Sequence, residues 1–135
     1  MSEKPVAQKL MIKEDRKVLF VNEPKGYRDS IGVPKNVDVL KGLQNADIIQ
    51  VFVNSRRDLE EQLPKLKKYL NQNGMLWVTY RKGSSKIKSD INRDSIYEYA
   101  LSVGLQGVAM IAVDENWSAL RMKVKGLPEE YKTAV

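Results

Sequence analysis

The chain has 135 residues, of which 42% are apolar and 30% charged, and this balance predicts one folded domain over residues 1–135. It contains no cysteine, which excludes disulfides, thiolate nucleophiles and sulfur-ligated metals. It also contains no histidine, so the commonest general base and the commonest transition-metal ligand are both missing. Composition therefore excludes histidine-dependent serine and cysteine hydrolases, zinc hydrolases and zinc deaminases, and no metal site is predicted.

The net charge of +6 and the isoelectric point near 9.5 predict a surface that attracts anions. The basic residues lie in small scattered clusters and form no long tail, so a small anionic ligand is favoured and a nucleic acid is a weaker alternative. No stretch approaches the roughly 20 apolar residues of a membrane-spanning helix, and no signal-peptide pattern opens the chain. We therefore expect a cytoplasmic protein that has no membrane partner.

The first third of the chain predicts short elements. Residues 4–12 suit a short amphipathic turn or helix, and residues 17–22 form the continuous apolar run of a strand that is buried on both faces. Residues 23–36 contain two prolines and two glycines, which allow at most one helical turn, around residues 27–31. Residues 37–40 suit a short edge strand. The five residues after it are too few for a helical crossover, so this strand either lies outside the parallel sheet or connects to it without a helix.

The middle of the chain predicts a strand–helix–strand unit. A second buried strand at residues 48–53 is followed by Ser55, a natural N-cap, and by a stripe of leucines with helical spacing. Pro64 falls inside this stripe and predicts a short leading turn followed by the main helix. Gly74 is expected to end the helix, and residues 75–80 form a third buried strand.

The last third predicts a helix and a hairpin. After a basic loop, Asp90 or Asn92 caps a helix that ends at Gly104. Two further strands, at residues 107–113 and 117–124, make an antiparallel hairpin at the end of the sheet. The predicted fold is an α/β three-layer sandwich with a mostly parallel, Rossmann-like sheet. Oligomeric state is not predicted. The edge strand of the hairpin is a possible pairing surface, although Arg121, Lys123 and Lys125 would discourage pairing there.

The loops that follow the three buried strands predict a binding site. In parallel sheets, ligands bind beyond the carboxyl ends of the strands, so these loops should meet at one edge. The candidate ligand-binding residues are Asn22, Glu23, Gly26, Tyr27, Arg28, Ser55, Arg56, Arg81, Lys82, Gly83, Ser84 and Ser85. A free helix N-terminus at Ser55 would add positive potential for an anion, and Tyr27 is the best candidate for ligand contact and for an acid or base. The alternative interpretation is a solvated basic loop beside a helix cap.

The half of the chain from residue 46 resembles the second half of a class I S-adenosylmethionine-dependent methyltransferase. Asp47 precedes a buried strand, a leucine–glycine turn ends the helix at residues 70–74, and a hairpin closes the sheet. The resemblance implies S-adenosylmethionine as the cofactor, held by an acidic glycine-rich turn and by a carboxylate after the second strand. Here the turn has Glu23 but Gly26 as its one glycine, and Leu40-Lys41-Gly42 stands where the carboxylate is expected. The cofactor is therefore disfavoured.

Nearly the whole chain resembles a family of short bacterial proteins of unknown function. The matching segments are Pro24-Lys25-Gly26-Tyr27, ADIIQVFVNSR, GMLWVTYRKGSS and VDENWSALRMK. This resemblance implies a fold and brings no activity with it. The sequence thus favours a non-catalytic or degenerate methyltransferase-like module that binds a small anionic ligand or a protein partner. The alternatives are a small methyltransferase with a divergent cofactor turn and, more weakly, a nucleic-acid binder.

Overall fold

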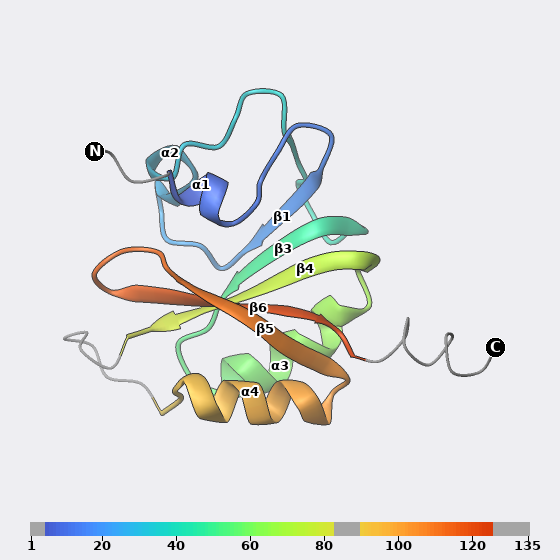
Figure 1. Cartoon of the computed structure of the whole chain (residues 1–135), viewed down its shortest axis with the longest axis vertical. Coiled ribbons are helices and arrows are strands. Elements are labelled where there is room, and N and C mark those ends of the chain that lie inside the picture. Colours follow the sequence, from blue (N-terminus) through green and yellow to red (C-terminus); the bar gives the residue numbers. More distant parts are fainter. Residues whose placement is uncertain (1–4, 83–89, 126–135) are drawn as a thin grey trace.

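A six-stranded mixed sheet with helices on both faces forms the framework in the computed structural model, which describes residues 5–82 and 90–125 (Figure 1). The elements in chain order are α1 (Val6–Lys9), β1 (Lys17–Val21), α2 (Tyr27–Ser30), β2 (Asp38–Val39), β3 (Ala46–Phe52), α3 (Arg56–Lys67), β4 (Leu70–Arg81), α4 (Arg93–Ser102), β5 (Leu105–Ala112) and β6 (Trp117–Val124). The strand order is β2-β1-β3-β4-β6-β5. The first four strands in this order are parallel, and β6 runs antiparallel to both of its neighbours. This confirms the predicted α/β fold with a closing hairpin.

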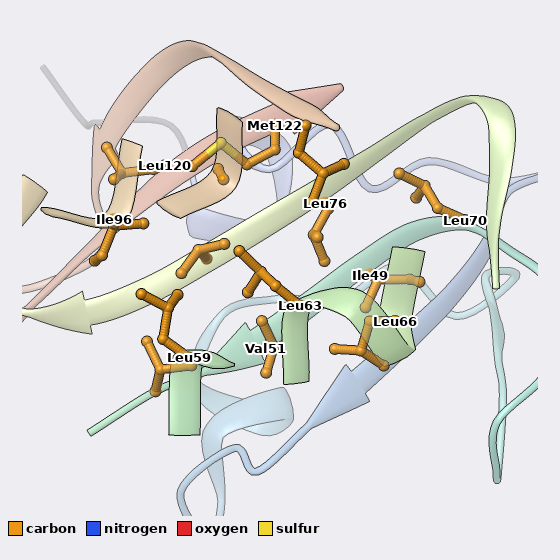
Figure 2. Packing of buried hydrophobic residues seen from close by; sticks show 14 of the residues in the cluster. Ile49, Val51, Leu59, Leu63, Leu66, Leu70, Leu76, Ile96, Leu120 and Met122 are labelled. Atoms are coloured by element: carbon orange, nitrogen blue, oxygen red, sulfur yellow. The ribbon is translucent and has the colours of Figure 1, made fainter. Parts of the chain in front are cut away.

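One face of the sheet is covered by α3 and α4. Side chains alternate between the two faces along a strand, so Ile49 and Val51 of β3 point to this side. They pack with the leucine stripe of α3 and with Ile96 of α4 (Figure 2). The leucines whose helical spacing predicted α3 are therefore the residues that pack this helix against the sheet.

The opposite face is covered by α1, α2 and the chain around them. Ile48 and Phe52 of β3 point to this side, together with Trp77 of β4. The buried Trp77 indole donates a hydrogen bond to the Leu10 carbonyl at 3.0 Å, which fixes the end of α1 on the sheet. Both short helices match the turns predicted in the first third of the chain.

Helix α3 runs without interruption through Pro64, so the predicted division at this residue is wrong. A proline inside a helix leaves the carbonyl four residues earlier without its usual donor. Here that carbonyl belongs to Glu60, and the Tyr99 hydroxyl of α4 donates to it at 3.3 Å. The side chain from the neighbouring helix replaces the missing backbone hydrogen bond.

The prediction that Gly74 ends the helix is also wrong. Helix α3 ends at Lys67, and Gly74 lies inside β4. Ala46 is paired with Leu70 and Ile48 with Met75, so β4 carries extra residues that bulge from the ladder at this point. A Cβ on Gly74 would lie 2.9 Å from the Asp47 carbonyl oxygen. Glycine is thus needed for the close approach of two backbones.

The two edges of the sheet show whether the short strand near residues 37–40 belongs to it and which strand of the hairpin is outermost. Strand β2 pairs in parallel with Lys17 and Val18, so it belongs to the sheet and connects to β3 without a helix. At the other side, β6 lies between β4 and β5, and the outermost strand is β5. The expectation that basic residues of the last strand protect the edge is therefore wrong. Within residues 5–82 and 90–125, no helix is long and apolar enough to cross a membrane.

Candidate functional site

The carboxyl ends of β1, β3 and β4 lie next to one another, as the sequence predicts, because these strands are parallel neighbours. The antiparallel β6 begins at the same edge, where Trp117 is paired with Arg81. The candidate residues from Asn22 to Lys82 therefore share one edge of the sheet. Gly83, Ser84 and Ser85 lie outside the described residues.

The turn after β1 forms a small hollow of about 290 Å³, lined by residues 23–29. Asn22 and Gly26 both adopt positive φ angles here, of 60° and 79°, and reverse the chain into α2. The Arg28 guanidinium donates to the Glu23 carboxylate at 2.6 Å and lies 5.1 Å from the Phe20 ring centre. The acidic group of this turn is thus already paired with a cation of the same turn.

Tyr27 borders this hollow, but its hydroxyl belongs to the core. The side chain is 7% exposed, and its ring contacts Phe20 and Phe52 edge-to-face. The Gln50 amide donates to the Tyr27 hydroxyl at 2.8 Å and to the Thr79 hydroxyl at 2.9 Å. Burial raises the pKa of Tyr27 far above its usual range, so the phenol stays protonated. These contacts do not support the predicted acid or base role.

The N-terminus of α3 is not free, which corrects the expectation at Ser55. The Arg56 N–H donates to the Asp90 carboxylate at 2.7 Å, and the Asp58 N–H donates to the Ser55 hydroxyl at 3.1 Å. The Arg56 side chain pairs with Glu60 at 2.8 Å. A carboxylate of the chain itself therefore takes the place that an anionic ligand would take.

The cations after β4 are differently placed. The Arg81 guanidinium lies 4.3 Å from the centre of the Trp117 ring, and its buried Nε has no hydrogen-bond partner among the described residues. Lys82 lines a second, larger hollow of about 410 Å³ on the side of the sheet that α4 covers. We call this the α4 hollow, and its lining residues are Tyr80, Lys82, Asn92, Arg93, Asp94, Met110 and Ser118.

Sequence reasoning missed most of the α4 hollow. The chain leaves β4 at the carboxyl edge of the sheet, so the helix that follows begins near that edge. On this ground, Arg93 could have been added to the predicted ligand-binding residues. Asn92 caps α4 through reciprocal hydrogen bonds with Ser95, so Arg93 is the first residue of the helix. Its side chain lines the α4 hollow. Ser118 could not be found in this way, because its position depends on β6 pairing with β4.

The α4 hollow combines charge with hydroxyl groups. Lys82 and Arg93 supply positive charge, and Asp94, 3.4 Å from the Arg93 guanidinium, offsets part of it. Burial raises the pKa of the Tyr80 hydroxyl, which therefore stays protonated and donates a weak hydrogen bond to the Met110 sulfur at 3.9 Å. No group of three or more acidic residues that could hold a metal ion occurs in the described part of the chain. Anion binding is the chemistry that this set of side chains suits.

Neither a family model nor a curated protein matches the sequence. Solved structures of methyltransferases do match the fold. A TehB-like SAM-dependent methyltransferase from Corynebacterium glutamicum aligns with a TM-score of 0.58 and 13% identity, over 92% of this chain and 90% of that one. The CcbJ methyltransferase from Streptomyces caelestis aligns with a TM-score of 0.60 and 8% identity, over 90% and 88%. DhpI, solved as a complex with SAH, aligns with a TM-score of 0.57 and 9% identity, over 81% and 76%.

These similarities confirm the Rossmann-like, class I methyltransferase-like fold that the second half of the sequence resembles. At such low identity they concern the fold alone, because one fold can carry many functions. The resemblance to short bacterial proteins of unknown function stays a prediction.

Proposed function

We propose that this chain is a methyltransferase-fold protein that binds a small anionic ligand in the α4 hollow and transfers no methyl group. The observation that carries the proposal is the position of Lys82 and Arg93 on one hollow of about 410 Å³ at the carboxyl edge. This volume lies within the usual range of about 300–1,000 Å³ for small-molecule sites. Of the other cations predicted at this edge, Arg28 and Arg56 are paired with carboxylates at 2.6 and 2.8 Å, and the Arg81 guanidinium lies over the Trp117 ring. Arg93 has a longer and more exposed contact with Asp94, at 3.4 Å.

The residues after β1 and β2 do not fit the cofactor of the neighbouring structures. The hollow after β1 measures about 290 Å³ and is lined by that turn alone, with no residue from β2 or β3. The Glu23 carboxylate is paired with Arg28. At the end of β2, Leu40 is buried and Lys41 is exposed, so no carboxylate stands there to hold ribose hydroxyls. We therefore assign no step of methyl transfer to this chain.

A small S-adenosylmethionine-dependent methyltransferase is the second candidate. The structural comparisons favour it, because the proteins reported above are methyltransferases and DhpI was solved with SAH. In that case the cofactor would need a mode of binding that tolerates a turn with one glycine and a paired Glu23.

Calorimetric titration separates the two candidates. Inorganic phosphate, ATP, S-adenosylmethionine and S-adenosylhomocysteine are titrated into the wild type and into Lys82→Glu/Arg93→Glu. The first candidate predicts binding of phosphate or ATP, weakened at least about tenfold in the double variant, because charge-assisted hydrogen bonds contribute about 1.5–3 kcal/mol each.

Lys13→Glu/Lys35→Glu is the matched control, since it changes net charge equally at two exposed positions away from the hollow. It should keep full affinity. Tight binding of S-adenosylmethionine that is unchanged in Lys82→Glu/Arg93→Glu would support the second candidate. If the control weakens phosphate binding as much as the double variant does, the attraction comes from net charge and the α4 hollow is not the site.

A further inference from the structure

Strand β5 forms one edge of the sheet and carries no charged residue. Its sequence is LQGVAMIA, in a chain where 30% of residues are charged. Within residues 5–82 and 90–125, it has β6 on one side and no strand of the sheet on the other (Figure 1). Exposed edges of this kind present unpaired backbone groups to other chains, and proteins usually protect them with charge, proline or a very short strand.

The opposite edge of the same sheet is protected in that way. Strand β2 has two residues, and one of them is the exposed Asp38. Strand β5 is four times as long, and its one protective feature is a bulge between Gly107 and Ala109. The two edges of this sheet therefore differ in a manner that suits pairing at β5 alone.

Apolar side chains gather at the β5 edge. The large apolar residues exposed in the described part of the chain are Leu43, Leu101, Val108 and Met110. Val108 and Met110 belong to β5, with exposures of 40% and 49%, and Leu101 lies on the adjoining α4. An apolar patch that continues from an open strand edge is typical of a protein–protein contact.

The two ends of β5 carry opposite charge. At its start, the Lys67 ammonium donates to the Val103 carbonyl at 2.9 Å. The backbone N–H of Lys125 donates to the Gly104 carbonyl, which places a second basic residue next to this end of the strand. Just beyond its end come Asp114 and Glu115. If two copies of β5 pair antiparallel, the basic start of one strand meets the acidic end of the other. Parallel pairing would place like charges together.

We infer that β5 pairs antiparallel with β5 of a second copy of this chain, about a two-fold axis near Ala109. The contact is self-complementary, as a two-fold interface requires, and it joins two six-stranded sheets into one continuous sheet. With the axis near Ala109, the regular stretch of each strand after Ala109 faces the bulged stretch of its partner, so the pairing spans the bulge between Gly107 and Ala109. Val108 and its symmetry copy then bury their exposed side chains near the axis.

Sedimentation equilibrium over about 1–100 µM tests the inference. The wild type should sediment at twice the 15.4 kDa mass of the chain. Val108→Lys places two added ammonium groups at the axis and should raise the dissociation constant of the dimer at least about tenfold. Val108 is chosen because Met110 also lines the α4 hollow, and this keeps the test independent of the ligand proposal.

Leu43→Lys is the matched control. Leu43 is 44% exposed and lies in the β2–β3 connection, so its substitution should leave the dimer intact. Circular dichroism checks that both variants are folded. A wild type that stays monomeric at 100 µM, or a Val108→Lys variant that dimerises like the wild type, would overturn the inference.

Cysteine cross-linking locates the contact, because the natural chain has no cysteine. Val108→Cys or Ala109→Cys should form a disulfide-linked dimer under mild oxidation, and Leu43→Cys should not. A wild-type dimer in which neither β5 variant cross-links would place the interface on another surface and would refute the β5 assignment.

Discussion

Asp47 shows how one carboxylate organises the amino-terminal edge of the sheet. Its oxygens accept from the Lys17 N–H and from the Asn71 side-chain amide, both at 2.8 Å. Partial burial works to raise the pKa of Asp47, but these two hydrogen bonds and the nearby positive charge of Arg16 outweigh it. The pKa is therefore lowered. The stretch of β4 that the helix prediction misassigned is tied to β3 through this group.

Replacing Asp47 with Asn should make the free energy of unfolding depend less on pH between pH 7 and pH 3. A carboxylate with a lowered pKa in the folded state contributes its full stabilisation above its unfolded pKa of about 4, and the contribution is lost as the pH falls through the folded value. We expect Asp47→Asn to be less stable than the wild type at pH 7 and to differ from it less at pH 3. Urea unfolding at both values measures the difference.

Asp38→Asn, at an exposed position on β2, serves as the control and should change stability little at either pH. A constant gap between Asp47→Asn and the wild type from pH 7 to pH 3 would show that the ionised form of Asp47 brings no stabilisation.

At the scale of elements, α3 depends on α4 and the residues before it. Asp90 accepts from the first N–H of α3, and Tyr99 donates to the carbonyl that Pro64 leaves without a partner. Both partners are more than thirty residues away in sequence. The sequence pattern could therefore predict the start of α3 and its leucine stripe. It could not predict that Pro64 lies inside one helix, or that the N-terminus is occupied.

Asp90→Ala should destabilise the protein by about 1 kcal/mol, because it removes both a hydrogen bond and a negative charge from the N-terminus of α3. Urea unfolding measures the loss. Sulfate at tens of millimolar should then restore part of the stability beyond its general effect, because the vacated N–H group can bind an anion.

Asp38→Ala removes an exposed carboxylate from β2, away from α3, and measures how much sulfate stabilises the protein without a vacated helix N-terminus. Equal responses of the two variants to sulfate would mean that Asp90 does not hold an anion position.

At the scale of the whole molecule, the sheet separates two cores. Both tryptophans of the chain, Trp77 and Trp117, lie on the face covered by α1 and α2, whereas α3 and α4 lie on the other. Strands β1, β3 and β4 each contribute to both cores through alternate residues. The prediction of a single domain implies that neither core can come apart while the other stays folded.

Urea unfolding followed by tryptophan fluorescence and by far-ultraviolet circular dichroism should therefore give coincident transitions. Fluorescence reports the face with the tryptophans, and circular dichroism is dominated by α3 and α4. A fluorescence midpoint at clearly lower urea would indicate that the face covered by α1 and α2 unfolds separately, against the prediction of one domain.

The sequence predicted the whole-molecule architecture better than it predicted the site. The sequence predicted that parallel buried strands bring their following loops to one edge of the sheet, and the parallel pairing of β1, β3 and β4 confirms this. The hairpin pattern could not tell which strand is outermost, because β5 and β6 are both apolar enough to lie inside the sheet. The α4 hollow depends on that order, since β4 and β6 supply Tyr80 and Ser118 side by side.

The position of β6 also bears on how the protein is made. Strand β6 follows β5 in the chain but fills the place between β4 and β5. During synthesis, β4 therefore emerges from the ribosome with one side unpaired, and it stays so until Val124 has also emerged. The nascent chain must keep the apolar β4 and β5 apart and unaggregated for that time. We expect translation that stalls before β6 to yield chains that depend on chaperones.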